Sequence, residues 1–338
     1  MTTAPDRARE DVTFRESVPP LREWARTFVV GLFMGTADGV PGVSGGTIAL
    51  IAGVYERLIA AITAVTPGRL LDGARALTPL DGGPSLDRAA AVLEEVDGWF
   101  LLALVAGVGT AVVAVGQVVE YADEHAPVLL FGLFFGLIGA SAAVLLREVS
   151  VRTVPEAVAV LAGIAVAFVA SGYSESALGS GGTPVVFLAG AIAVSAMILP
   201  GLSGSLILVI LGQYTFMYGR LGAFIDGLVA VVTDRTLAGL VGPAADVATF
   251  ILGGLAGLFT ISRVIRRAID ANREVTFAFL VALVIGALRA PVATLNGPDY
   301  DVAWTTETTG AFAGAALVGA IIVLVLDWYA VDIDLDGL

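Results

Sequence analysis

The chain has 338 residues, of which 57% are hydrophobic and 14% are charged, and its mean hydropathy is +0.90. Because a soluble domain carries about 25% charged residues, this composition excludes a soluble globular protein and predicts an integral membrane protein. The net charge is −13 and all basic residues are arginines; this acidic, lysine-free composition disfavours a nucleic-acid partner and is typical of organisms living in high salt, which screens self-repulsion.

The chain begins with a polar segment and continues as a series of apolar ones. Residues 1–23 are mixed in charge and lack the apolar core of a signal peptide, so we expect a cytoplasmic N-terminal segment. The apolar segments lie at about 24–38, 44–63, 99–121, 127–147, 154–172, 184–199, 203–219, 247–266, 274–290 and 310–328. A spanning helix needs roughly 20 residues. Runs such as Val128–Leu146 lack the alternation of a membrane β-barrel, so the predicted fold is all-α with about 8–10 helical segments.

These segments form one transmembrane domain over residues 24–330. Its expected parts are repeat one at about 24–148, a linking helix at 154–172, repeat two at about 184–290, a final helix at 310–328 and then an acidic tail at 331–338. The polar stretch 64–98 is predicted to be a surface loop with a short interfacial helix at its end, and 171–182 a flexible loop.

Two stretches of the chain repeat one another at a constant offset of 159 residues. Residues 37–55, ADGVPGVSGGTIALIAGVY, align with 196–214, AMILPGLSGSLILVILGQY, with 9 of 19 positions identical; composition alone would give roughly two. Later helices match weakly at offsets of 146–147, for example Gly107–Val118 with Gly253–Val264. The chain therefore contains an internal repeat.

The number of segments predicts that the two repeats are inverted. Each repeat has four apolar segments and one segment separates them, so the second enters the membrane from the opposite side, as in many transporters. The positive-inside rule places the N-terminus in the cytoplasm, for a multi-pass protein of the cell membrane. Most arginines then lie inside, and Arg220 and Arg235 are the exceptions.

Each copy carries a Pro-Gly-x-Ser-Gly break between apolar segments, which predicts a broken or re-entrant helix pair in each repeat. Non-helical backbone cannot face lipid, because each unsatisfied N–H or C=O group costs several kcal/mol, so we expect both breaks to lie inside the protein and to meet near the midplane. Ser44 and Ser203 are suited to cap the helices that follow, which would direct two positive helix ends at one point. That point, rich in glycines and hydroxyls, is predicted to bind phosphate or carboxylate. Simple kinks or close helix packing are the alternatives.

Charged residues near the first break extend this candidate site. Intramembrane ionisable groups are functional candidates: Glu56 would carry a coupling proton, and Arg57 would pair with it or with a phosphate oxygen. The alternatives are a surface ion pair for these two residues and a capping role for Asp38. The candidate substrate-binding residues are Asp38, Pro41, Gly42, Ser44, Gly45, Gly46, Thr47, Glu56, Arg57, Pro200, Gly201, Ser203, Gly204 and Ser205. With no cysteine and one histidine, His125 in a polar loop, no catalytic residue, metal site or cofactor is predicted.

These motifs resemble those of a known family. GTADGVPGVSGGTIALIAGVYERLI, residues 35–59, is similar to the signature of a prokaryotic membrane family, formerly a domain of unknown function and now regarded as polyprenyl-phosphate (undecaprenyl-phosphate) transporters. LPGLSGS, residues 199–205, resembles the family's second copy. The resemblance spans about residues 22–330 and, with the composition, implies a haloarchaeal member. The two copies differ chemically, because Ser205 and Met197 replace Gly46 and Asp38.

The resemblance implies flipping of a polyprenyl monophosphate lipid carrier, which is recycled for cell-envelope or glycan synthesis. The phosphate head would bind between the breaks while the isoprenoid tail stays among membrane lipids. Transport would run downhill or be coupled to a proton or sodium ion, and no enzyme activity is expected. A carrier or channel for a small soluble anion is the main alternative; a membrane enzyme acting on lipid phosphates and a non-transporting scaffold are the others.

Overall fold

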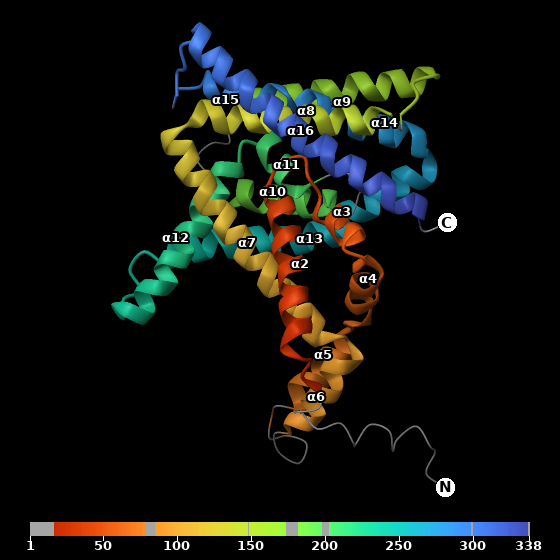
Figure 1. Cartoon of the computed structure of the whole chain (residues 1–338), viewed down its shortest axis with the longest axis vertical. Helices are drawn as coiled ribbons and strands as arrows, with labels where there is room; N and C mark the ends of the chain where they lie inside the picture. The colour runs from red at the N-terminus through yellow and green to blue at the C-terminus, as the bar shows by residue number, and fades with distance from the viewer. Residues whose placement is uncertain are drawn as a thin grey trace. The chain divides into compact units, whose positions relative to one another are not determined.

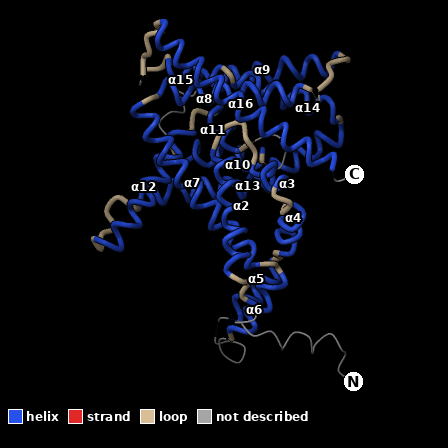
Figure 2. Tube along the Cα trace, in the orientation of Figure 1, coloured by secondary structure: helices blue, strands red, loops and turns tan. Residues whose placement is uncertain are grey.

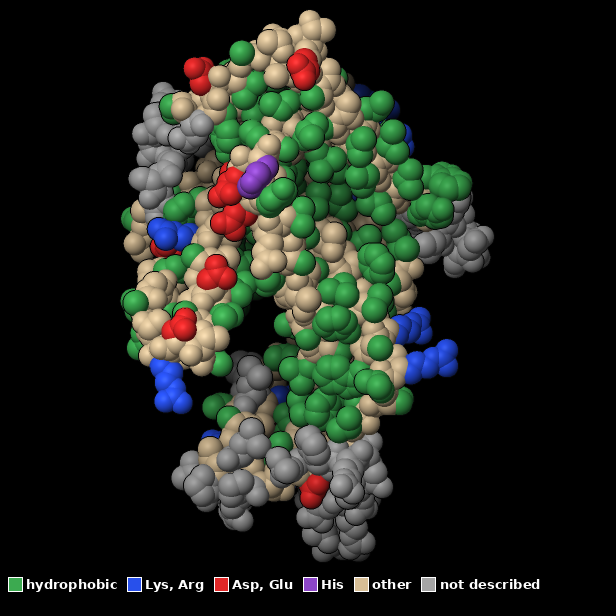
Figure 3. Space-filling model, turned by 60° about the vertical axis from the view of Figure 1, so that its left-hand side comes forward, with side chains coloured by type: hydrophobic (Ala, Val, Ile, Leu, Met, Phe, Trp, Pro, Cys, Tyr) green, Lys and Arg blue, Asp and Glu red, His purple; other side chains and the backbone are tan. Residues whose placement is uncertain are grey.

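The structure is a computed structural model that describes residues 17–76, 78, 85–147, 149–173, 182–197, 203–298 and 300–336. Within these residues the regular secondary structure is helical throughout (Figure 2). Seven of the described helices are long and apolar enough to cross a membrane, or eight if the bent pair α3–α4 counts as one span. Hydrophobic side chains cover much of the face in Figure 3, as lipid contact requires. The prediction of an all-α membrane protein is confirmed.

The helices follow one another with short connections (Figure 1). Their bounds are α2 Leu21–Gly39, α3 Gly45–Ile51, α4 Tyr55–Ala64, α5 Pro67–Ala76, α6 Leu86–Glu95, α7 Gly98–His125, α8 Pro127–Leu146, α9 Val154–Tyr173, α10 Thr183–Ala196, α11 Gly204–Ile210, α12 Tyr214–Thr233, α13 Val241–Ala271, α14 Arg273–Ala287, α15 Arg289–Leu295 and α16 Thr306–Asp336. The chain divides into two compact units. The first unit contains the described residues up to Gly35 together with Ile48–Ala111, and the second contains Thr36–Thr47 and the chain from Val112 onwards.

Several predicted boundaries are wrong. The predicted segments 44–63 and 203–219 are each split in two, because a further break separates α3 from α4 and α11 from α12. The polar stretch 64–98 contains two helices, α5 and α6, instead of one; both are short and amphipathic, so they lack the continuous apolar run used to find spans. Helix α15 begins at the end of the predicted segment 274–290 and continues beyond it, and α16 continues into the predicted acidic tail. Most of the predicted loop 171–182 lies outside the described residues.

Glycines allow equivalent helix pairs to form in each unit. In the first unit, a Cβ added at Gly107 of α7 would overlap the carbonyl oxygen of Phe28 on α2. In the second unit, a Cβ at Gly253 of α13 would overlap the carbonyl oxygen of Phe187 on α10. The spacings from Phe28 to Phe187 and from Gly107 to Gly253 equal the offsets of 159 and 146 found in the sequence. The internal repeat is therefore reproduced in helix packing, where small residues permit close backbone approach.

The core of the second unit is built around α8, which packs against α16, while α9 packs against α14 (Figure 1). Pro127 starts α8 at the first helical turn, where its missing N–H has no intrahelical partner to lose. Phe134, Leu137 and Ile138 of this helix are fully buried. This placement matters for function, because α8 also supplies Ser141 to the first break.

Gly136→Ala is expected to lower the melting temperature of the detergent-purified protein. A Cβ at Gly136 of α8 would overlap the carbonyl oxygen of Ala316 on α16, and overpacking of a core typically costs about 1–3 kcal/mol. Gly314→Ala on α16 is the matched control, because no atom lies within 4 Å of the added Cβ. Equal melting temperatures for the two variants would contradict this account of the α8–α16 contact.

Candidate functional site

The first break, residues 40–44, is held by side chains from distant parts of the second unit. The phenols of Tyr214 and Tyr218 both donate to the Gly39 carbonyl oxygen, at 2.6 and 3.2 Å. The Ser141 hydroxyl donates to the Gly42 carbonyl oxygen at 2.5 Å. The phenols supply donors to a carbonyl that the end of α2 leaves without an intrahelical partner, and Ser141 does the same for a carbonyl of the break itself. The expectation that the break lies inside protein is met by this arrangement.

The Ser203 hydroxyl joins the two breaks directly. Its oxygen accepts a hydrogen bond from the Gly42 N–H at 3.1 Å and another from the Leu206 N–H at 3.2 Å. The second bond makes Ser203 the N-cap of α11, as predicted. The hydroxyl of Ser205 lies 3.2 Å away from that of Ser203, and both serines are buried. We call this contact between Gly42 and Ser203 the junction.

The two copies differ in how the following helix is capped. At α3, the carboxylate of Asp38 accepts a hydrogen bond from the Gly45 N–H at 2.7 Å, so the capping role for Asp38 that was left open is observed. Ser44 contributes its backbone carbonyl to Thr47 N–H, whereas Ser203 caps with its side chain. A carboxylate at a helix N-terminus also interacts favourably with the helix dipole.

A further break follows α3 and α11, and sequence reasoning missed it. Gly53 and Gly212 have φ of +67° and +62°, a left-handed conformation that glycine adopts without steric cost. Helices α3 and α4 are bent by 117° at this point. The same capping bonds occur in both copies, from Val54 N–H to Ala49 O at 2.9 Å and from Gln213 N–H to Leu208 O at 2.8 Å. The glycine pair was visible as an identity in the repeat alignment.

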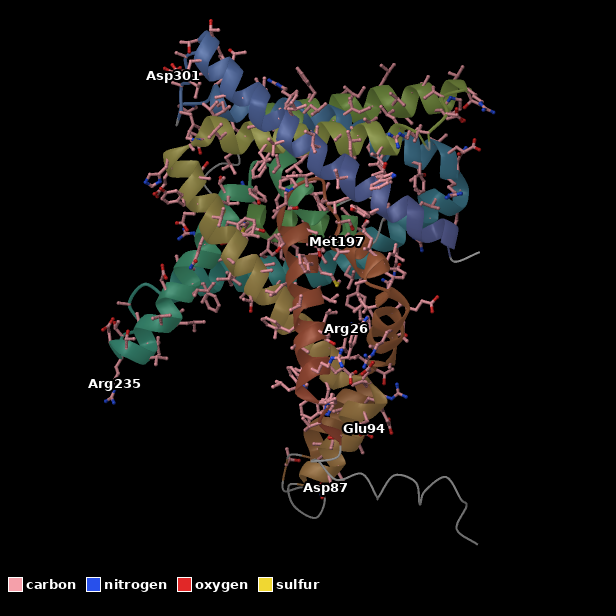
Figure 4. The ribbon with its side chains drawn as sticks, viewed as in Figure 1. Arg26, Asp87, Glu94, Met197, Arg235 and Asp301 are labelled. Atoms are coloured by element: carbon pink, nitrogen blue, oxygen red, sulfur yellow. The ribbon has the colours of Figure 1, made fainter. Side chains whose placement is uncertain are left out.

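A cavity of about 210 Å³ lies in the second unit beside the junction. Met197, labelled in Figure 4, is one of its lining residues. The side chains that give it polar groups come from Asp38, Ser205 and Tyr218. The apolar part of its lining comes from Val112, Ala193, Val194, Met197, Leu208, Met217, Leu221, Val247 and Phe250. The cavity is therefore a mainly apolar space, and the three residues with polar side chains in its lining come from both copies of the repeat and from α12.

The predicted site residues are distributed unevenly. Asp38, Gly204 and Ser205 line the cavity, and Gly42 and Ser203 form the junction. Five further predicted residues of the first break are described but do not line the cavity. They are Pro41, which is fully buried, and Ser44, Gly45, Gly46 and Thr47. Pro200 and Gly201 lie outside the described residues. The buried phenols of Tyr214 and Tyr218, and Ser141, were not predicted, because no motif around them marks a partner so far away in the sequence.

Glu56 and Arg57 belong to the first unit. The guanidinium of Arg57 pairs with Asp97, at 2.5 Å from Nε, and with Glu23, at 3.3 Å from Nη1. These pairs replace the predicted partnership with Glu56. Both acidic partners and Arg57 itself are partly exposed, so each pair contributes little stability.

Removal of both phenols is expected to destabilise the protein by more than the two single changes added together. Tyr214→Phe or Tyr218→Phe leaves the Gly39 carbonyl with one of its two donors, whereas the double variant leaves a buried acceptor unsatisfied, at a cost of about 1–3 kcal/mol. A double-mutant cycle from thermal unfolding in detergent measures the coupling. Tyr55→Phe is the control: Tyr55 is the repeat equivalent of Tyr214, but it is exposed. Strict additivity would contradict the shared-acceptor geometry.

The fold and this site define a multi-pass, all-helical membrane protein with a cavity beside two joined helix breaks. The chain belongs to the VCA0040-like family, described as undecaprenyl phosphate translocase-like, whose profile matches residues 34–311. This confirms the resemblance noted from the breaks. The match covers both of them and most of the second unit.

Two curated relatives carry the same name. The polyprenyl-phosphate transporter of Vibrio cholerae serotype O1 is 30% identical over 266 residues, which cover 78% of this chain and 75% of the relative. The polyprenyl-phosphate transporter of Staphylococcus aureus is 30% identical over 288 residues, covering 81% of this chain and 87% of the relative. No solved structure matches the chain.

Proposed function

We propose that this protein flips a polyprenyl monophosphate across the cell membrane and so returns the lipid carrier for reuse in envelope or glycan synthesis. Family membership and the names of both relatives support the substrate class. The observation that carries the proposal is the cavity: Ser205 in its lining lies 3.2 Å from the Ser203 hydroxyl of the junction, and most of the lining is apolar. A ligand with a charged head and a hydrocarbon chain matches that division.

The phosphate head would bind at the junction. There, the Gly42 N–H and the Ser203 hydroxyl are hydrogen-bonded to one another, so a phosphate oxygen that accepts from both groups would replace the bond between them. The hydroxyl of Ser205 is a further donor. Helix ends with free donors are suited to phosphate. The breaks would separate around the head and close again after its release.

The isoprenoid chain would lie only partly inside the protein. Pockets that enclose a whole drug-sized ligand measure about 300–1,000 Å³, and this cavity measures about 210 Å³. It therefore has room for the part of the chain nearest the head, and the rest would remain in lipid. A small soluble anion has no use for an apolar lining of this kind, which disfavours the alternative carrier or channel.

Asp38 suggests how a coupling ion would take part. Its carboxylate lines the cavity that would receive a phosphate, and two negative charges at close range in a poorly solvated site repel strongly. Uptake of a proton or sodium ion at Asp38 would remove the repulsion. In this proposal Asp38 takes over the coupling role that sequence reasoning gave to Glu56.

The two copies are proposed to form inverted repeats that exchange access between the two sides. Their local hydrogen bonds and glycine contacts recur at fixed offsets, and inverted repeats with discontinuous helices are the usual basis of alternating access. The N-terminus would be cytoplasmic, following the distribution of arginines.

The test is a flipping assay in proteoliposomes. A labelled short-chain polyprenyl monophosphate is incorporated at high salt, and its loss from the outer leaflet is followed with and without imposed proton or sodium gradients. Protein-dependent loss, accelerated by one gradient, is expected. Uptake of inorganic phosphate without any loss of the lipid would instead establish the small-anion carrier.

A further inference from the structure

A second cavity, of about 510 Å³, lies in the first unit between α2 and α4. Three arginines line it: Arg22 and Arg26 from α2 and Arg57 from α4. Figure 4 shows Arg26 on the side of α2 that faces α4. Val30, Val54 and Phe100 give the same cavity an apolar wall. Glu23 also lines it, so the cavity combines three cationic groups, one carboxylate and an apolar wall.

The charge of Arg57 is already compensated. Its Nε and Nη2 atoms donate to the two carboxylate oxygens of Asp97 at 2.5 and 2.9 Å, and its Nη1 donates to Glu23 at 3.3 Å. The guanidinium also lies 4.3 Å from the centre of the Phe100 ring. These contacts hold Arg57 in the wall of the cavity, and the guanidinium together with its two carboxylate partners carries one net negative charge.

Arg22 and Arg26 are the other two cationic residues of the lining, which also contains the carboxylate of Glu23. Neither forms an ion pair with any residue that the structure describes. They are four residues apart on α2, so their guanidiniums lie on one face of the helix. Like charges at this spacing destabilise a helix unless an anion lies between them. The cavity therefore presents two adjacent cations to a ligand.

We infer that this cavity binds the phosphomonoester head of the lipid carrier, as a second station besides the junction. A phosphomonoester carries about −1.5 to −2 charges at pH 7. The guanidiniums of Arg22 and Arg26, which have no ion-pair partner among the described residues, can each hold phosphate oxygens through paired hydrogen bonds. The diester of an ordinary phospholipid carries one charge fewer. The apolar wall receives the beginning of the isoprenoid chain. The choice of lipid rests on the proposed function; the choice of a dianionic head rests on the two arginines.

The test is equilibrium binding to the full chain in nanodiscs of neutral phosphatidylcholine. The probe is a labelled short-chain polyprenyl monophosphate, and Ser203→Ala serves as background so that the junction contributes little. Arg22→Gln/Arg26→Gln is expected to weaken binding roughly tenfold or more, because two charged hydrogen-bonding groups are lost. Arg75→Gln/Arg235→Gln removes the same charge from residues outside the cavity and is expected to leave binding within about twofold. Binding should also weaken as the pH falls below about 6, where the head takes up its second proton.

Three results would overturn the inference. The first is unchanged binding by the Arg22→Gln/Arg26→Gln variant. The second is equal competition by phosphatidylglycerol, which would indicate a general lipid site, and the third is equal competition by inorganic phosphate, which would indicate a free-phosphate site. The flipping assay separates this inference from the proposed function. Flipping by the wild type with unchanged binding in the arginine variant refutes the second station alone. Arginine-dependent binding without any flipping supports the station and refutes translocation.

Discussion

Ser203→Ala is expected to abolish most polyprenyl-phosphate flipping and to lower the free energy of unfolding by about 1–3 kcal/mol. The hydroxyl is buried and accepts from the N–H groups of Gly42 and Leu206. Its removal leaves both donors without that acceptor and disconnects the two breaks. It also removes the hydroxyl proposed to hold the phosphate. Flipping in proteoliposomes and thermal unfolding in detergent measure the two effects separately.

Ser195→Ala is the matched control for this variant. Ser195 is also fully buried in the second unit, but its hydroxyl donates to Ala191 within its own helix, at 2.6 Å. Its removal is therefore expected to cost little stability and to leave flipping near the wild-type rate. A folded Ser203→Ala protein that flips lipid as fast as Ser195→Ala would exclude the junction as the binding site.

The internal repeat explains which parts of the site could be predicted from the sequence. A Pro-Gly-x-Ser-Gly motif present twice at one offset indicates two equivalent breaks, and serine before an apolar helix indicates a cap; Ser203 has that role. The partners that hold the first break could not be found in this way. Ser203, Ser141 and Tyr214 are 161, 99 and 175 residues away from their backbone partners in the sequence. Only the folded chain brings them together.

Hydrophobicity alone concealed the break between α3 and α4. Residues 44–63 are apolar for the length of a span and therefore predict one helix, although glycine occurs at the equivalent positions 53 and 212 of the two copies. Their positive φ angles show why glycine occurs there. An identity at a residue with poor helix propensity would have been sufficient to predict this turn.

The arginine-lined cavity was missed for a different reason. Arg22 and Arg26 precede or begin the first apolar segment, where basic residues are expected merely from the positive-inside rule. That rule accounts for their presence without assigning them a ligand. Their position opposite Arg57, which is paired with Asp97 and Glu23, depends on contacts between α2, α4 and the start of α7.

Gly42→Ala is expected to destabilise the protein by about 2–5 kcal/mol and to eliminate flipping. Gly42 has a φ of +89°, and an added Cβ would lie 2.9 Å from the Ser141 hydroxyl oxygen and 3.0 Å from the Leu137 carbonyl oxygen. A left-handed backbone costs a residue with a side chain about 1–2 kcal/mol, and overpacking typically adds about 1–3 kcal/mol. The break would have to move away from α8, which would also shift the Gly42 N–H from Ser203. Thermal unfolding and the flipping assay both report this change.

Gly46→Ala distinguishes this geometric requirement from a general need for glycine in the motif. Gly46 lies within α3, and the nearest atom to an added Cβ is the Ser44 hydroxyl oxygen at 3.4 Å. Alanine is favoured over glycine inside a helix by up to about 1 kcal/mol, so stability is expected to be unchanged or slightly higher. If both variants unfold at the same temperature, the packing of Gly42 against α8 does not explain why the motif has glycine at this position. If only Gly42→Ala is destabilised, the glycine is needed for the turn that presents its N–H to Ser203, and any loss of flipping in the stable Gly46→Ala protein then reports on ligand contact with α3.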